Sequence, residues 1–309
     1  MCRNGAGFRL RFFFAEGVLP PRIPLTAIVL AGVMLLAMAD HAPARQSAQK
    51  GQPLARRRAP FRVPSENEIT DTVFRASAMR GRALLLATRD SLPRNVGNGL
   101  RCASCHLDGG LRPNAMPWVG SYARFPQYRT RNGKVDLIED RINDCFERSM
   151  NGRRLVSDGK DMRDIVAYFA FLSIGLPVGV EMEGQGFPRL TPVKGDLARG
   201  AMVFTTTCAR CHGDNGQGTA LAPPLWGSRS YNRGAGMARI NTAASFIYAL
   251  MPIDRAVTLT PQAAFDVSTY INTRPRPEFP RRAHDWPRGG RPPDADYHIL
   301  PVPTKEKAP

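Results

Sequence analysis

Acidic residues are in short supply in this sequence of 309 residues. There are 26 Asp and Glu against 43 Lys and Arg, so the net charge is +17. Such a charge attracts anions, which include nucleic acids, acidic membranes and small acidic substrates. Because no RNA- or DNA-binding motif accompanies the charge, we do not expect nucleic acid as a partner. The length leaves room for two modest domains, each with its own core.

Long apolar runs are also lacking. The run from Leu25 to Ala39 spans 15 residues, which is shorter than the about 20 residues of a membrane-spanning helix. Arginines precede this run and Ala42-Pro43-Ala44 follows it, an order typical of a signal peptide and its cleavage site. We therefore predict a signal peptide over residues 1–44 and export to the periplasm. The alternative is an uncleaved anchor, which would place the protein at a membrane.

Cysteine and histidine are rare as well, with six and five copies. Cys2 falls in the predicted signal peptide, and four other cysteines belong to two C-x-x-C-H motifs. The motif residues are Cys102, Cys105 and His106 in the first, and Cys208, Cys211 and His212 in the second. This pattern attaches haem c by two thioether bonds, and the His binds the iron. A zinc ribbon would space its cysteine pairs about 15–20 residues apart, and disulfides would need no adjacent His, so we predict two covalently bound haem c groups.

The segments around the two motifs repeat each other. RGRALL (80–85) precedes the first motif and RGAMVF (199–204) the second, and each half closes with a related segment, DIVAY (164–168) or DVSTY (266–270). The closing segments carry apolar residues at helical spacing. This order resembles the class I cytochrome c fold, in which a first and a last helix cross beside the haem. We predict an all-α fold of two tandem class I cytochrome c domains with loop-rich haem crevices.

The predicted boundaries follow from this repeat and from composition. They are an N-terminal linker over 45–65, domain 1 over 66–174, a Gly- and Pro-rich linker over 175–194, domain 2 over 195–273 and a Pro- and Arg-rich tail over 274–309. The tail has no clear period, so we expect it to be wrapped on the surface or disordered.

Histidine is too scarce for each haem iron to receive a second one. Apart from the motif residues and His41 in the signal peptide, only His284 and His298 remain, and both lie in the tail. We therefore expect methionine or cysteine to supply the other axial ligands.

Matching offsets indicate those ligands. Met251 lies 39 residues after His212, and Cys145 lies 39 residues after His106. In a tandem repeat these positions are equivalent, so we predict a His/Met pair at the second haem and a His/Cys pair at the first. A buried free thiol is the alternative for Cys145. The rival ligands are Met116 and Met150 at the first haem and Met237 at the second, where Met237 and Met251 could exchange during redox cycling.

The helix predicted around Cys145 carries side chains suited to an oxyanion. Asp136 and Glu139 have the spacing of a capping box at its start. Arg141 stands four residues before Cys145 and Ser149 four residues after it, so they flank the sulfur. Arg129, Arg131 and Lys134 lie upstream on a predicted loop that can close over the site. We predict a catalytic site of Cys145, Arg131, Arg141 and Ser149; a solvated surface is the alternative for each arginine.

Three stretches closely resemble the dihaem thiosulfate dehydrogenase family. They are FPQYRTRNGKVDLIEDRINDCFERSMNG in the first half and PPLWG and GAGMARINTAASFIYALMP in the second. The resemblance covers about residues 66–277. The shorter R-I-N-x-C core is also similar to the cytochrome subunit of the Sox complex, so that core by itself is less specific.

This resemblance implies that two thiosulfate ions are oxidised to tetrathionate, or the reverse, and that electrons leave to a soluble or tethered cytochrome c or a similar acceptor. It also implies that the haem with His106 and Cys145 hosts catalysis, while the haem with His212 and Met251 relays electrons. We hypothesise that Cys145 leaves the iron and carries a sulfane–thiosulfonate adduct, since a thiol flanked by cations is a good nucleophile. The competing functions are a non-enzymatic dihaem electron carrier and a Sox-type sulfur transferase subunit.

Overall fold

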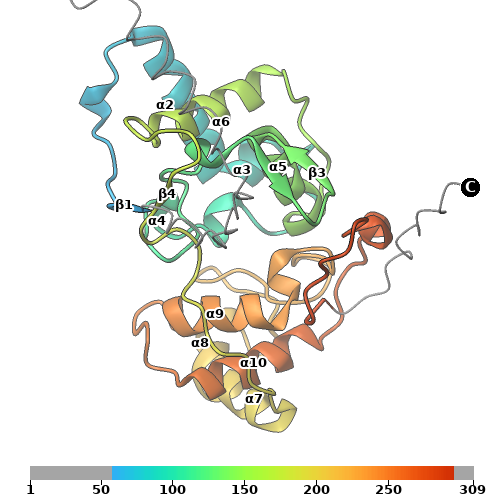
Figure 1. Ribbon diagram of the computed structural model, residues 1–309. Helices are drawn as coiled ribbons and strands as arrows, with labels where there is room; N and C mark the ends of the chain where they lie inside the picture. Colours follow the sequence, from blue (N-terminus) through green and yellow to red (C-terminus); the bar gives the residue numbers. More distant parts are fainter. Residues whose placement is uncertain (1–57, 296–309) are drawn as a thin grey trace, which may run out of the picture. The chain divides into compact units, whose positions relative to one another are not determined.

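The computed structural model describes residues 58–295. The predicted signal peptide, the first part of the N-terminal linker and the end of the tail lie outside the described residues, as do Cys2, His41 and His298. Helices joined by long loops make up most of the described chain (Figure 1). Among the described residues, no helix combines the length and the apolar character needed to cross a membrane.

Two crossing helices form the frame of domain 1. Helix α2 (Thr72–Leu86) begins after Asp71, whose carboxylate accepts a hydrogen bond from a first-turn N–H at 2.7 Å, as is usual for a capping residue. Helix α6 (Lys160–Phe171) packs across α2. The approach is so close that a Cβ atom on Gly81 would lie 1.9 Å from the carbonyl oxygen of Asp164. Any larger residue would therefore force the two helices apart.

Domain 2 repeats this crossing with different helices. Helix α7 (Leu197–Val203) packs against α10 (Pro261–Asn272), which also packs against α9 (Ile240–Leu250) (Figure 1). A Cβ atom on Gly200 would lie 2.1 Å from the carbonyl oxygen of Asp266. The glycine of each repeated R-G segment thus meets the aspartate of each closing segment.

An ion pair closes each crossing. In domain 1, the guanidinium of Arg80 donates to the carboxylate of Asp164. In domain 2, Nε of Arg199 donates to Oδ2 of Asp266 at 2.8 Å. Both aspartates are buried. The repeated segments therefore fold into equivalent helix pairs, and the tandem helical frame predicted from the repeat is confirmed.

Two short pairs of strands, which the sequence did not predict, complete the fold. Strand β1 (Arg58–Ala59) pairs in parallel with β4 (Glu181–Met182), and β2 (Gln127–Arg129) pairs antiparallel with β3 (Lys134–Asp136). The loop expected upstream of the cysteine helix is therefore a β-hairpin. Its turn contains Gly133, which adopts a φ of 65°, a conformation that glycine tolerates best.

The predicted capping box ahead of Cys145 is wrong. Helix α5 (Ile138–Asp144) has Leu137 as its N-cap, and the N–H of Leu137 donates to the carboxylate of Asp140 at 3.1 Å. Asp136 instead ends strand β3, where it is fully buried and hydrogen-bonded within the hairpin. The carboxylate of Asp136 accepts a hydrogen bond from Asn132 in the hairpin turn and does not cap the helix. The N-cap therefore lies one residue later, at Leu137.

The remaining helices are short. They are α3 (Thr88–Ser91), α4 (Leu107–Gly110), α8 (Ala209–His212), the 3-10 helices η1 (Glu66–Glu68), η2 (Cys102–Ser104), η3 (Tyr122–Arg124), η6 (Gly236–Ala238) and η7 (Pro280–His284), and the π-helical turns η4 (Cys145–Ser149) and η5 (Phe204–Cys208). Single π-helical turns are frequent at functional sites. One of the two begins at Cys145, directly after α5.

The first half of the predicted linker packs onto domain 1. The carbonyl oxygens of Gly184 and Gly186 accept hydrogen bonds from the N–H groups of Asn114 and Met116 at 2.7 and 3.2 Å. These bonds attach the linker to the loop that follows the first C-x-x-C-H motif. The domain boundaries themselves stay a prediction.

Candidate active site

A backbone carbonyl holds the imidazole of each C-x-x-C-H motif. Nδ1 of His106 lies 2.6 Å from the carbonyl oxygen of Met116, and Nδ1 of His212 lies 2.7 Å from that of Pro223. A proton on Nδ1 donates this bond, which leaves Nε2 to bind a metal. Burial lowers the pKa of His212, although its bond to Pro223 opposes the shift. The neutral, metal-binding form is therefore favoured.

A cavity of about 280 Å³ opens beside the first motif. It is lined by Cys102, Cys105 and His106 from the motif and by Cys145 from η4. The structure therefore brings together the four residues predicted to hold the first haem. The five cysteines of the described chain form no disulfide, so both motif thiols are available for thioether bonds. This donor set fits a haem c.

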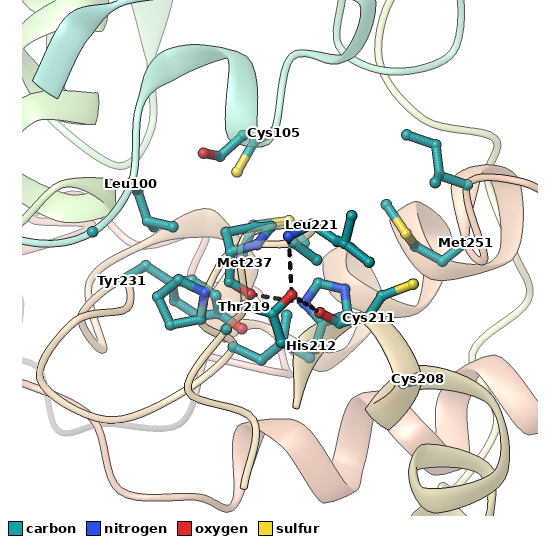
Figure 2. A pocket seen from close by; sticks show the side chains of 18 of the residues that line it. Leu100, Cys105, Cys208, Cys211, His212, Thr219, Leu221, Tyr231, Met237 and Met251 are labelled. Carbon is teal, nitrogen blue, oxygen red and sulfur yellow. Dashed lines mark hydrogen bonds between the residues drawn. The ribbon is translucent and has the colours of Figure 1, made fainter. Parts of the chain in front are cut away.

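A larger cavity, of about 740 Å³, lies at the second motif. Cys208, Cys211, His212 and Met251 line it, and Figure 2 shows their side chains together with Met237 and Leu221. Apolar side chains make up much of the remaining wall, namely Leu107, Leu225, Phe246, Ile247, Leu259 and Ile271. A largely apolar crevice with two thiols and an oriented imidazole also fits a haem c.

The rival ligands lie in the same two cavities. Met116 and Met150 line the first, and Met237 lines the second together with Met251. Of the sulfur side chains in the first cavity, Cys145 is the one bonded to both His106 and an arginine.

Arg141 holds the sulfur of Cys145 at close range. Its Nη1 donates to Sγ at 2.8 Å, a bond that links the last full turn of α5 to the first residue of η4. Burial would raise the pKa of the Cys145 thiol, but the charge of Arg141 and the contact with His106 outweigh it and lower the pKa to about 7. The site therefore favours a thiolate, which is the form that binds iron and attacks electrophiles.

Arginines dominate the polar lining of this cavity. Arg124 and Arg129 line it together with Arg141 and Arg101, and no carboxylate is found among its described lining residues. Burial and the nearby charge of Arg141 lower the pKa of Arg129 to about 10. Crowded, partly buried guanidinium groups repel one another, and a bound anion relieves that repulsion. The arrangement suits a small oxyanion.

The structure separates the predicted site residues into two groups. Cys145, Arg141 and Ser149 line the cavity. Arg131 is not among the described lining residues: its Nε donates to Asp285 at 2.8 Å, and its guanidinium stacks 4.9 Å from the ring centre of Trp286. The position of Arg131 does not agree with its predicted contact to substrate, because the hairpin turn directs it to the tail.

Arg129 lines the cavity, although it is not among the site residues predicted from the sequence. Arg129 lies in strand β2, two residues before Arg131, and the intervening turn sends the two side chains to different partners. Recognition of the turn residues Asn132 and Gly133 as a hairpin signal would have separated them. Arg124, in the short helix before the hairpin, carried no such signal.

The two cavities share part of their walls. Leu100, Arg101 and Cys105 line both of them, and Figure 2 shows Leu100 and Cys105 at the second cavity. Because Cys105 is a thioether cysteine of the first motif, the two cofactor sites are neighbours.

Comparison with protein families assigns both halves of the chain. The family described as SoxA/TsdA, cytochrome c domain, matches residues 94–178. The family described as cytochrome C oxidase, cbb3-type, subunit III, matches residues 195–271. Both halves are thus cytochrome c domains, which supports two covalently bound haem c groups.

Similar proteins cover most of the chain. The thiosulfate dehydrogenase of Stutzerimonas stutzeri is 37% identical over 84% of this chain and 86% of its own length. That of Allochromatium vinosum is 44% identical over 70% of this chain and 84% of its own. The solved thiosulfate dehydrogenase TsdBA of Marichromatium purpuratum matches 72% of this chain with a TM-score of 0.69 and 39% identity, and this chain spans 50% of that one.

Proposed function

The chain belongs to the thiosulfate dehydrogenase family of cytochromes c, and on this premise we propose that it oxidises two thiosulfate ions to one tetrathionate ion in the periplasm. The observation that carries the proposal is the joint presence of Cys145, Arg129 and Arg141 in the cavity of the first C-x-x-C-H motif. The predicted signal peptide, Leu25–Ala39 with its flanks, supports the location.

The two cytochrome c domains give each haem a different ligand pair in this proposal. His106 and Cys145 would hold the haem of domain 1, and His212 and Met251 would hold that of domain 2. The bound haems supply one-electron oxidising power, and two of them match a two-electron reaction. A thiolate ligand lowers a haem potential and a thioether raises it, so electrons run from domain 1 towards domain 2.

The arginines bring the anions together. Thiosulfate is a dianion, so a second ion is repelled by the first unless cations offset the charge. The guanidinium groups of Arg129 and Arg124 line the cavity that also holds the sulfur of Cys145. Guanidinium binds an oxyanion through two parallel hydrogen bonds, which fixes the sulfonate end and leaves the sulfane sulfur to face the thiolate. Ser149 offers a further donor from the same wall.

Cys145 reacts with the bound ion. Its thiolate forms an S–S bond with the sulfane sulfur of the first thiosulfate, a two-electron oxidation for which the two haems, when bound, would supply the oxidant. The sulfane sulfur of the second thiosulfate then attacks that of the first and breaks its bond to Cys145. The products are tetrathionate and the restored thiolate, so atoms and charges balance. Arg141, 2.8 Å from Sγ, stabilises the thiolate as a leaving group.

Electrons leave through domain 2. Cys105 and Leu100 connect the two cavities, and Leu221 at the second cavity is 81% exposed. An exposed apolar rim on a basic protein suits a soluble or tethered cytochrome c, or a similar acceptor, with an acidic face. No nucleic acid and no second subunit is needed for turnover in this proposal.

The test is thiosulfate-dependent reduction of ferricyanide by the haem-loaded protein, with tetrathionate measured as product. We expect Cys145→Ala to retain two haems and to lose at least about 1,000-fold in kcat, because it removes both ligand and nucleophile. Met150→Leu is the matched control, since it removes a buried sulfur from the same cavity at similar volume. No turnover by the wild type would make the chain an electron carrier instead.

The anion site is tested in the same assay. Arg129→Gln should raise the KM for thiosulfate by about tenfold to a hundredfold, because it removes a charged hydrogen-bond donor from the oxyanion. Arg163→Gln, an exposed position on α6, makes the same change of net charge away from the cavity and should leave KM unchanged. If the two variants raised the KM equally, thiosulfate binding would depend on the net charge of the protein and not on Arg129 itself.

A further inference from the structure

The segment that follows domain 2 returns to the catalytic domain. We name residues 279–287 the C-terminal strap. Its carboxylate, Asp285, is 4% exposed and receives two arginines of domain 1. Nη1 and Nη2 of Arg148 donate to it at 2.9 and 2.7 Å, and Nε of Arg131 donates at 2.8 Å. A fork-like double bond of this kind fixes orientation as well as distance.

Each of these arginines also lies against an aromatic ring of the strap. The guanidinium of Arg148 is 4.3 Å from the ring centre of Phe279, and that of Arg131 is 4.9 Å from the ring centre of Trp286. Such contacts are stronger when water is excluded from them, and Arg148, Phe279 and Trp286 are buried. The strap therefore holds both arginines from two sides.

The two arginines do not line the catalytic cavity themselves, but each lies on a segment that contributes a lining residue. Arg148 lies in η4, three residues after Cys145. Arg131 lies in the hairpin turn, two residues after Arg129. The buried carboxylate of Asp285 thus links η4, which contains Cys145, to the hairpin that contains Arg129.

Further contacts fix the hairpin end of the strap. The N–H of Trp286 donates to the carbonyl oxygen of Arg131 at 2.8 Å. A Cβ atom on Gly133 would lie 2.5 Å from Cγ of Pro287. Trp286 adopts a φ of 56°, which costs energy in a bulky residue and persists only when surrounding contacts impose it. The strap is therefore seated on the hairpin rather than lying loosely over it.

A polar network joins the same two walls from inside. Nδ2 of Asn132 in the hairpin turn donates to Asp136 at 2.6 Å and to Asp144 at 3.1 Å. Asp144 directly precedes Cys145 and lies 3.5 Å from Nε of Arg148. The strap extends this network, because Nη1 and Nη2 of Arg148 donate to Asp285 while its Nε lies near Asp144.

We propose that the C-terminal strap is a positioning element, in which Asp285 and Trp286 hold Arg129 and Cys145 at the separation that thiosulfate binding requires. The inference rests on the proposed function, because it presumes that this cavity takes thiosulfate. It gives the Pro- and Arg-rich tail a role in catalysis, and it assigns Arg131 to positioning rather than to substrate contact.

The experiment compares Asp285→Asn and Trp286→Ala with the wild-type holoprotein. Displacement of a binding group by a fraction of its reach costs between about tenfold and a hundredfold, so both variants should raise the KM for thiosulfate by this factor and change kcat less. Trp286→Phe keeps an aromatic ring over Arg131 and should restore the wild-type KM. Asp158→Asn, an exposed position of domain 1 outside the strap, makes the same type of substitution as Asp285→Asn and is the matched control.

Hydrogen exchange gives a readout that does not depend on thiosulfate. Amide protection of residues 127–136 should fall in Trp286→Ala and recover in Trp286→Phe. If Asp285→Asn fails to fold because Arg148 is left buried beside a neutral side chain, the two Trp286 variants carry the test. An unchanged KM and unchanged protection in Trp286→Ala would overturn the strap, whereas a wild type without thiosulfate turnover would overturn the proposed function instead.

Discussion

The two halves of the molecule share one scaffold and differ in the sulfur side chain that shares a cavity with the motif histidine. In both, a glycine meets the aspartate of the closing helix, and an arginine pairs with that aspartate. In both, a tryptophan lies edge-on to the tyrosine of the closing helix, Trp118 with Tyr168 at 6.3 Å and Trp226 with Tyr270 at 6.0 Å. The helix crossing and the orientation of the imidazole are therefore the same in both domains.

The difference begins 39 residues after each histidine. Domain 1 has Cys145 on a π-helical turn with Arg141 bonded to its sulfur. Domain 2 has Met251 directly after α9, in a cavity with many apolar side chains. The strap contacts the segment of the first of these positions, through Arg148. The two cavities therefore differ in the sulfur side chain at this position and in the charges that surround it.

The largest effect should come from making domain 1 resemble domain 2. Cys145→Met keeps a sulfur ligand but removes the thiolate and its nucleophilicity. We expect both haems to be retained, the potential of the domain 1 haem to rise, and thiosulfate turnover to fall by at least about 1,000-fold. Redox titration and the ferricyanide assay measure the two effects on one preparation.

This substitution separates ligation from reaction. If Cys145→Met raised the potential but kept the turnover, the sulfur would act only as a ligand and the covalent step would be wrong. If it changed neither quantity, Cys145 would be a buried thiol and a rival such as Met150 would hold the iron.

An intermediate effect is expected at the ligand of domain 2. Met251→Leu should lower the potential of the domain 2 haem, since it removes the thioether that raises it, and should slow electron transfer to the acceptor more than thiosulfate binding. Met237→Leu makes the same change at the rival position in the same cavity. Redox titration of both variants identifies the ligand, and a shift confined to Met237→Leu would exchange their roles.

Features that depend on local order were predictable from sequence. The C-x-x-C-H motifs fixed both histidines and four thiols, and the repeat of R-G and D-x-x-x-Y segments predicted the helix crossing, because a glycine, an arginine and an aspartate recur at matching places. The equal offsets brought Cys145 into the first cavity and Met251 into the second. These signals can be recognised because the same residue types recur in the same order in both halves of the chain.

Contacts between distant segments were not predictable. Asp285 lies 154 positions from Arg131 and 137 from Arg148, and no composition rule links them. The sequence predicts a loop rather than a hairpin here because the strands are three residues long, too short for a clear alternation. The prediction therefore selects Arg131, whereas Arg129 is the arginine of this hairpin that lines the cavity.

The smallest effect should appear in the shared scaffold, where the two domains ought to respond alike. Burial would raise the pKa of Asp164 and of Asp266, but their bonds to Lys160, Ser77 and Arg80, and to Arg199 and Gln262, lower it below the ordinary value. Each therefore contributes stability above the unfolded-state pKa of about 4, and this is lost as the pH falls through the lower folded value.

Asp164→Asn and Asp266→Asn should each lower the free energy of unfolding by about 1–3 kcal/mol near neutral pH, because a charged hydrogen-bond acceptor becomes neutral. Below about pH 4 the gap to the wild type should narrow, since the wild-type carboxylates are then being protonated as well. Calorimetry of the holoprotein across pH measures the decrease in the free energy of unfolding and its pH dependence. The exposed Asp158→Asn is the control. If only one of the two substitutions lowered the free energy of unfolding, the ion pair would not stabilise the other domain. The close contact at the glycine would then be what the repeated segments contribute there.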